Sequence, residues 1–198
     1  GELNTQREEL AALNSLNEIV SEITATVIEK STREEIEEVV CDALAATDSY
    51  EFAWLAGVDS QTDTLEPRVT AGTQGYAEEI TVSLDSDDPE SQGPGATAVR
   101  EQETQIVQDV FADPDFEPWR EYAAEYGYRS AAAIPITHED TIYGVLGVYT
   151  DRQVAFSDDE RAVIGQLGEV VGHSIAAVER KQALLSDEIV ELSFRFVN

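Results

Sequence analysis

The sequence predicts an α+β fold, and three features of the 198-residue chain lead to this prediction. Long segments with helical periodicity lie near both ends of the chain. Between them, short apolar runs bounded by turn residues are typical of β-strands. Residues 122–184 combine a helix, two strands and a long capped helix in one continuous order. Hydrophobic residues make up 42% of the chain, which is enough to build a packed core.

Residues 3–28 are predicted to form one helix, because apolar side chains recur at helical spacing without glycine or proline. With the heptad counted from Leu3, Asn17 occupies an a position, where a buried amide can fix the register of a parallel dimer. The apolar stripe widens at Leu16 and Ile23, so packing on the chain's own domain is the alternative. The expected dimer seam on this helix consists of Leu10, Leu13, Asn17, Val20 and Val27.

A second helix is predicted to begin near residue 33, because Thr32 and Glu35 form a capping-box pattern. It should end near Ala46. Cys41 lies among the apolar residues of this helix. A lone helical cysteine of this kind is interpreted as a small packing residue rather than as a nucleophile.

The middle of the chain is predicted to hold strands and short helices separated by turns. Residues 85–95 form an acidic loop without the glycine and the distal glutamate of an EF-hand, so a solvated loop is favoured over a calcium site. Pro118 suits the first turn of a helix. The expected strands are 50–58, 65–71, 80–84, 105–109, one within 125–136, and 143–150, and the expected short helices are 95–102 and 119–126.

The last helix is predicted to begin at Ser157, which forms a second capping box with Glu160. Its apolar surface is too wide to be buried against one sheet. Val163, Val170 and Ala177 form a stripe of their own beside the main one. We therefore expect these three residues to contact a partner helix in a homodimer.

Three motifs follow one another in the C-terminal half of the chain. Residues 125–136 hold a Gly-x-x-Ser turn and a strand that ends in proline and isoleucine, 143–150 hold a Gly-x-Leu-x-Val strand, and 156–160 open a helix with Phe-Ser. This order resembles a GAF domain, and the resemblance covers about residues 33–184. It implies an α/β/α sandwich with a six-stranded antiparallel sheet. The N- and C-terminal helices would cover one face, and pocket helices and loops the other.

Residues 188–198 alternate polar and apolar side chains, which predicts a strand. This tail resembles the start of the domain that follows GAF in bacterio-opsin-activator-like regulators of halophilic archaea. We therefore divide the chain into a signalling or coiled-coil helix (1–31), a GAF-like sensory domain (32–185) and a linker with the start of a following domain (186–198). A glycine start and the lack of methionine suggest a fragment of a longer protein, with its output domain C-terminal.

The residues that carry the known chemistry of GAF relatives are missing. The branch that reduces free methionine sulfoxide uses several cysteines, and Cys41 is the only cysteine here, with no histidine near it for a bilin site. The cyclic-nucleotide signature needs a lysine, and none lies between Lys30 and Lys181. His138 and His173 are interpreted as a loop residue and a packing residue. No catalytic residue or metal site is assigned, and the cofactor is unknown.

The remaining candidate site is a small-molecule pocket, whose walls are implied by the GAF resemblance. Aromatic rings would offer stacking faces and polar groups would orient a ligand. Arg100, taken to lie near a helix start, suggests an anionic ligand. Each of these residues also has an explanation as a packing or ion-pair residue. The candidate ligand-binding residues are Trp54, Arg100, Asp109, Trp119, Tyr122, Arg129 and Ser130.

The charge of the chain restricts its surroundings. It has 41 Asp plus Glu against 12 Lys plus Arg, a formal net charge of -29. We interpret this excess as adaptation to a salt-rich cytoplasm, with an ordinary acidic domain as the alternative. The same charge argues against nucleic-acid contact by this fragment. The lack of a signal sequence or long apolar run predicts a cytoplasmic protein without a membrane anchor.

Together these features predict a non-catalytic sensory or regulatory domain of a cytoplasmic signalling or transcription-regulating protein. It would bind a small ligand or partner and relay the signal through a helical homodimer interface. One alternative is a purely structural dimerisation and spacer module. A GAF-type enzyme is a third and less favoured class.

The net charge predicts that stability depends on salt. The melting temperature should rise with KCl, because the screening length falls from about 30 Å at 0.01 M to about 3 Å at 1 M and self-repulsion is lost. Differential scanning fluorimetry across this range measures the effect, with sucrose at matched osmolality as the control. A melting temperature that is insensitive to KCl would contradict the interpretation.

Overall fold

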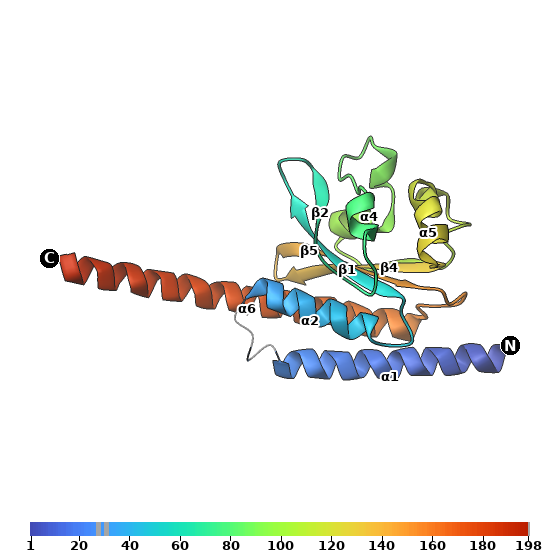
Figure 1. Ribbon diagram of the computed structural model, residues 1–198, viewed down its shortest axis with the longest axis horizontal. Coiled ribbons are helices and arrows are strands. Elements are labelled where there is room, and N and C mark those ends of the chain that lie inside the picture. Colours follow the sequence, from blue (N-terminus) through green and yellow to red (C-terminus); the bar gives the residue numbers. More distant parts are fainter. Residues whose placement is uncertain (27–28, 30–31, 198) are drawn as a thin grey trace.

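The chain folds into an antiparallel sheet that lies between two layers of helices (Figure 1). The computed structural model describes residues 1–26, 29 and 32–197. Within these ranges the strands are β1 (Phe52–Asp59), β2 (Thr64–Ala71), β3 (Gln105–Val107), β4 (Ser130–His138) and β5 (Thr141–Thr150). The helices are α1 (Glu2–Thr26), α2 (Arg33–Ala45), α3 (Tyr76–Glu79), α4 (Pro94–Glu101), α5 (Arg120–Tyr126) and α6 (Asp158–Val197), and the 3-10 segments are η1 (Pro89–Ser91) and η2 (Pro114–Trp119).

The strand order is β2-β1-β5-β4-β3, with every neighbouring pair antiparallel. The α/β/α sandwich is therefore confirmed, but the described residues form five strands instead of the expected six. The predicted strand 80–84 pairs with β2 only through an isolated bridge between Thr64 and Ser83. Backbone hydrogen bonds from Leu65 N to Val82 O (2.9 Å) and from Leu84 N to Asp63 O (2.8 Å) hold this segment beside the sheet edge.

In both predicted capping boxes, the hydroxyl that precedes the helix accepts a hydrogen bond from a backbone N–H of the first turn, as expected. The backbone N of Glu35 donates to Thr32 Oγ1 at 3.2 Å, and the backbone N of Glu160 donates to Ser157 Oγ at 3.3 Å. The Glu160 carboxylate, however, accepts from the backbone N of Phe156 at 2.9 Å. These bonds satisfy amide groups that have no partner within the helix.

One helical layer consists of α1, α2 and α6 (Figure 1). Helices α2 and α6 lie on the sheet, and α1 packs outside them. Helix α6 contacts the backbone of β4 directly, since a Cβ at Gly172 would come within 2.0 Å of Thr137 O. Helix α1 buries Leu16, Ile19 and Ile23 in the same core. This agrees with the alternative prediction for residues 3–28, in which the helix packs on its own domain.

The tail is helical, so the strand predicted over 188–198 is wrong for the residues that are described. Helix α6 continues to Val197 and extends beyond the sheet (Figure 1), while Asn198 lies outside the described residues. A strand needs a neighbouring strand for its backbone hydrogen bonds, whereas a helix makes them internally. No strand lies beside this segment in the described structure.

Within the described ranges, no helix has an apolar stretch long enough to cross a bilayer.

A buried ion pair joins the end of the sheet to the start of α6. Arg152 Nη2 lies 2.7 Å from Glu160 Oε1, and both side chains are buried. Tyr50 Oη donates to the same carboxylate at 2.8 Å, and the Arg152 guanidinium lies 5.5 Å from the centre of the Tyr50 ring. Burial and the neighbouring Glu160 carboxylate raise the pKa of Tyr50 far above its usual range, so the phenol stays a donor.

A second buried carboxylate ties α2 to the sheet. Glu37 is fully buried, and its carboxylate lies 2.6 Å from Arg33 Nε and 2.9 Å from Arg68 Nε. Arg68 comes from β2 and Arg33 from the first turn of α2.

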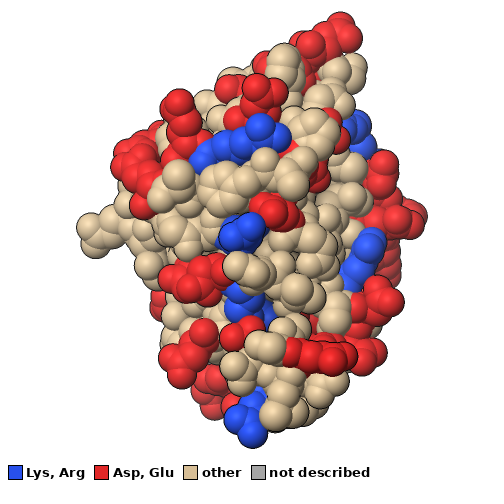
Figure 2. Space-filling view, turned by 90° about the vertical axis from the view of Figure 1, so that its right-hand side faces the viewer, with Lys and Arg blue, Asp and Glu red and all other residues tan. Residues whose placement is uncertain are grey.

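Acids dominate the surface of the molecule. Figure 2 shows a face on which isolated Lys and Arg side chains lie among Asp and Glu.

Replacing Glu160 with alanine should lower the free energy of unfolding by about 3 to 5 kcal/mol, because the Arg152 charge would stay buried without its partner. Denaturant titration at about 1 M KCl, where surface repulsion is screened, measures the change. The matched control is Asp159→Ala, which removes an exposed acid from the same turn. Equal losses in the two variants would contradict the importance of this ion pair.

Candidate functional site

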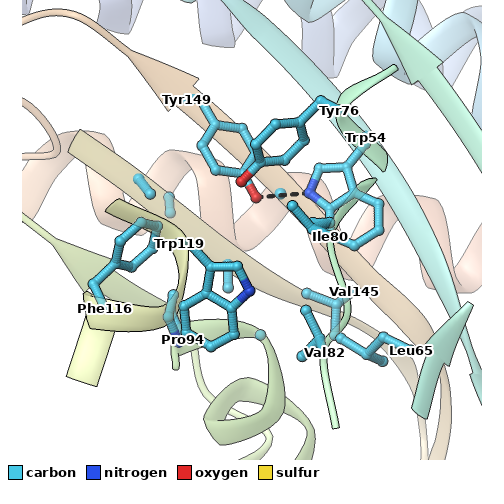
Figure 3. A pocket seen from close by; sticks show the side chains of 15 residues that line it. Trp54, Leu65, Tyr76, Ile80, Val82, Pro94, Phe116, Trp119, Val145 and Tyr149 are labelled. Carbon is cyan, nitrogen blue, oxygen red and sulfur yellow. Dashed lines mark hydrogen bonds between the residues drawn. The ribbon is translucent and has the colours of Figure 1, made fainter. Parts of the chain in front are cut away.

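The sheet face opposite α1, α2 and α6 carries an aromatic core with a small cavity (Figure 3). The floor is formed by β1, β4 and β5, and the walls by α3, the start of α4, η2 and the segment 80–82. About 30 Å³ of the cavity is open to water-sized molecules. The lining residues are Trp54, Leu65, Tyr76, Ile80, Val82, Pro94, Gly95, Phe116, Trp119, Ala131, Ala132, Ala133, Val145, Gly147 and Tyr149.

Hydrogen bonds connect the polar atoms beside the cavity. Trp54 Nε1 donates to Tyr149 Oη at 2.7 Å, as Figure 3 shows, and the hydroxyls of Tyr76 and Tyr128 lie 2.8 Å apart. Burial raises the pKa of Tyr149 to about 12, and it raises the pKa values of Tyr76 and Tyr128 as well. The hydroxyls therefore stay neutral over the whole physiological pH range.

Trp119 forms the wall that faces the acidic loop. A Cβ at Gly93 would come within 2.3 Å of Trp119 Cζ3, so the ring lies directly against the backbone before α4. Trp119 Nε1 donates to Thr81 O at 3.2 Å. Only glycine at position 93 allows this close approach. The loop, the segment 80–82 and η2 are thereby held together above the sheet.

Of the seven candidate ligand-binding residues, the structure places Trp54 and Trp119 in the cavity lining and the other five outside it. Arg100 lies in the last turn of α4, not near a helix start, and Arg100 Nη1 donates to Ser91 O at 2.8 Å. Tyr122 Oη donates to Glu79 O at 3.2 Å on the outer side of α3.

The remaining three candidates hold the polypeptide around β4. Arg129 Nη2 lies 3.4 Å from Asp109 Oδ2, and both side chains are partly exposed. Ser130 Oγ lies 2.6 Å from Gln108 O and 2.9 Å from Arg152 O. These contacts make Ser130 a structural bridge between two loops.

Sequence reasoning missed most of the lining, above all Tyr76 and Tyr149. Tyr149 follows the Gly-x-Leu-x-Val motif and faces the cavity because it alternates with the buried Val148. That alternation is readable from the strand, but Tyr76 lies in a short helix whose position no local pattern indicates.

The predicted dimer residues lie in different environments. Leu10 is 60% exposed and Asn17 is exposed, whereas Leu13 and Val20 are half-buried. Val27 lies outside the described residues. Along α6, Val163 and Val170 are half-buried against the domain core, and Ala177 is exposed.

Cys41 is fully buried in α2, and burial together with the nearby Glu37 carboxylate raises its thiol pKa well above the usual range. A thiol in this state is a poor nucleophile. The rings of His138 and His173 are 4.9 Å apart between their centres. In the described part of the chain, no group of three or more His, Cys, Asp and Glu side chains could hold a metal ion.

A family model described as the GAF domain matches residues 30–176. The chain belongs to the GAF domain family. This GAF domain is 29% identical over 98% of its length to a candidate transcriptional regulator of Haloferax volcanii. It is 24% identical over 96% of its length to the bacterioopsin transcriptional activator of Halobacterium salinarum. The chain spans 31% and 27% of these two relatives, and the predicted resemblance to haloarchaeal regulators is confirmed.

Solved structures agree with the GAF fold. The GAF domain of a phosphoenolpyruvate-protein phosphotransferase from Coxiella burnetii superposes with a TM-score of 0.68 at 18% identity, covering 86% of this chain and 98% of the other. A free methionine-R-sulfoxide reductase from Neisseria meningitidis, solved with its substrate, also reaches 0.68 at 18% identity, covering 84% and 91%. At this identity the similarity defines the fold alone.

Replacing Tyr149 with phenylalanine should lower the free energy of unfolding by about 1 to 3 kcal/mol, because the buried indole N–H of Trp54 loses its acceptor. Denaturant titration measures this loss. Tyr122→Phe is the control, since its hydroxyl lies at the surface of the aromatic core, and it should cost less than about 0.5 kcal/mol. Comparable losses in both variants would show that the Trp54 bond does not stabilise the cavity wall.

Proposed function

We propose that this chain is the non-catalytic sensory domain of a transcriptional regulator, and that it binds a small molecule in the aromatic cavity. The observation that carries this proposal is the position of the cavity. It lies on one face of a sheet whose other face carries α6, the longest described helix. The two regulatory relatives support the same role, since each aligns with almost the whole chain.

Strand β4 gives the signal a physical route through the sheet. Its side chains alternate, so Ala131 and Ala133 belong to the aromatic core around the cavity while Ala132 and Ile134 belong to the core below α6. A Cβ at Gly168 would lie 2.6 Å from Ile134 Cγ2 and 2.7 Å from Pro135 O, which means that α6 packs closely on this strand. A ligand that favours one position of β4 would thereby favour one position of α6.

Helix α6 also supplies a surface for a second copy of the chain. The apolar stripe at Val171, Ile175 and Val178 is buried against the domain, and it continues at spacings of three and four residues. It reaches Leu185 and Ile189, which are 51% and 64% exposed. A stripe with this period predicts a coiled coil with another helix.

The side chains along this stripe favour a parallel pair. Gln182 and Ile189 take a positions and Leu185 a d position, and Ile at a with Leu at d favours two parallel strands. The flanking positions Lys181 and Ser186 would face each other across the pair without repulsion between acids. In a chain with 41 acidic residues, this is the condition that an interface between two copies must meet.

The cytoplasmic, salt-adapted setting belongs to the same proposal. The acidic surface suits molar salt, and both regulatory relatives come from haloarchaea. In the proposed homodimer, α1 would add Leu10, Leu13, Asn17 and Val20 beside α6. DNA contact would lie in a domain outside this acidic fragment.

A purely structural dimerisation and spacer module is the second candidate, and the small size of the cavity favours it. The aromatic side chains leave only about 30 Å³ open, far less than the roughly 300 Å³ or more of a typical ligand site. Sensing therefore requires that the cavity opens when the ligand binds. An enzyme of the reductase type is disfavoured, because the single cysteine is buried as a high-pKa thiol.

The relay is tested by placing charges on the exposed stripe of α6. Leu185→Asp combined with Ile189→Asp should convert a dimer to a monomer, as measured by size-exclusion chromatography with light scattering in molar KCl. In the full-length regulator, the same pair should abolish the response of a reporter gene.

The matched control is Leu184→Asp combined with Val190→Asp, which changes equally exposed apolar residues outside the stripe. Leu184 continues the neighbouring row of Val163, Val170 and Ala177. Loss of the dimer only in the control pair would move the seam to that row. A monomeric wild-type chain, or a reporter that responds in both variants, would overturn the proposed relay.

A further inference from the structure

We propose that the aromatic cavity takes a small uncharged molecule, apolar or aromatic, rather than a nucleotide, a phosphate or a carboxylate. This inference rests on the proposed sensory function and names the chemical class of its ligand. It replaces the anionic ligand that the position of Arg100 in the sequence suggested.

The first argument is the lining itself. None of the 15 lining residues is Asp, Glu, Lys, Arg or His, although charged residues make up 27% of the chain. A charged ligand in such a cavity would lose its hydration without gaining a partner, which costs several kcal/mol. A neutral ligand gains about 25 cal/mol for each Å² of apolar surface that it buries.

The second argument is the position of the nearby arginines. Arg100 donates to Ser91 O at 2.8 Å and to Thr97 Oγ1 at 3.2 Å, and Arg129 pairs with Asp109. Arg120 Nη2 donates to Asp113 O at 2.8 Å. These contacts hold three guanidinium groups on the outer side of the loops. None of the three lines the cavity.

The third argument concerns the polar atoms beside the cavity. In the part of the chain that the structure describes, no buried side-chain nitrogen or oxygen lacks a hydrogen-bond partner. The Trp54 indole is bonded to Tyr149, and Tyr76 to Tyr128. The hydroxyls of Tyr76 and Tyr149 are also hydrogen-bonded to each other. A tyrosine hydroxyl has one donor and two acceptor sites, so each of these two hydroxyls can make one further bond to a ligand. A phenol or an indole fits this capacity, whereas a phosphate needs several donors.

The fourth argument is size. The open space of about 30 Å³ holds only one or two water molecules, so any ligand must displace part of the wall. The ring of the wall residue Trp119 rests on the loop backbone at Gly93. A single planar ring could occupy the space that this indole leaves, with apolar contacts of the same kind. The ligand is therefore a molecule of one or two rings.

The test compares isosteric neutral and charged compounds on the wild-type chain in molar KCl. Nitrobenzene and indole are the neutral probes, and benzoate and adenosine monophosphate are the anions. Thermal shift and isothermal titration calorimetry measure binding. Nitrobenzene should bind at least about tenfold tighter than benzoate, a difference of about 1.4 kcal/mol.

Two variants locate the binding. Ala133→Val adds two methyl groups to the cavity floor, and Gly147→Ala would bring a Cβ within 2.3 Å of Trp54 Nε1. Both variants should abolish binding of the neutral probes. Because the two substitutions are independent, either variant alone is sufficient if the other does not fold. Ala11→Val, on the exposed surface of α1, is the control and should bind as the wild type does.

Each outcome separates the ligand class from the proposed function. If benzoate or the nucleotide binds the wild type and Ala133→Val blocks that binding, the neutral ligand class is overturned and the sensory function stays intact. Neutral binding that survives Ala133→Val would place the ligand elsewhere and overturn the inference. No binding by any probe would overturn it too and favour the spacer role.

Discussion

The buried ion pair between Arg152 and Glu160 fixes the position on which the rest of the molecule depends. It holds the end of β5 against the first turn of α6, and Tyr50 extends the same contact to the segment before β1. Both charges are desolvated, so each is stable there only because the other is present. With its start fixed, α6 crosses the sheet along a single line, and Gly168 and Gly172 then lie against the backbone of β4. The direction in which the helix leaves the domain follows from this geometry.

The sheet between the cavity and α6 is thin at β4, because the first four residues of this strand have small side chains. These residues are Ser130, Ala131, Ala132 and Ala133. Larger residues would fill the space on each side and separate the layers. With small ones, the aromatic core packs on Ala131 and Ala133, and α6 contacts the same strand a few residues further on, at Pro135 and Thr137. In the proposed relay, contacts of the cavity and of α6 with this one strand would couple ligand binding to the position of the helix.

The molecule keeps its charged side chains out of the aromatic cavity. A net charge of -29 is carried on the surface, while the cavity contains no ionisable acid or base apart from tyrosines with raised pKa values. A reductase and a phosphotransferase domain share this fold with equal TM-scores. The properties of the present chain therefore come from its side chains: a buried thiol, an uncharged cavity and an exposed apolar stripe on α6. Fold similarity alone would not have indicated these properties.

The sequence by itself determined α1, α2, α4, α5 and the start of α6, two helix caps, five of the strands and the GAF family, because helical and strand periodicities and caps are properties of neighbouring residues. It did not determine which side chains meet across the sheet. Trp54 and Trp119 were identified as candidates, but Arg100 and Ser130 face away from the cavity, and Tyr76 reaches it from a four-residue helix. The alternating tail after Glu188 shows the same limit, since a period of two yields a strand only where another strand offers hydrogen bonds. Only the tertiary structure decided these points, because register, partner strands and burial depend on residues far apart in the chain.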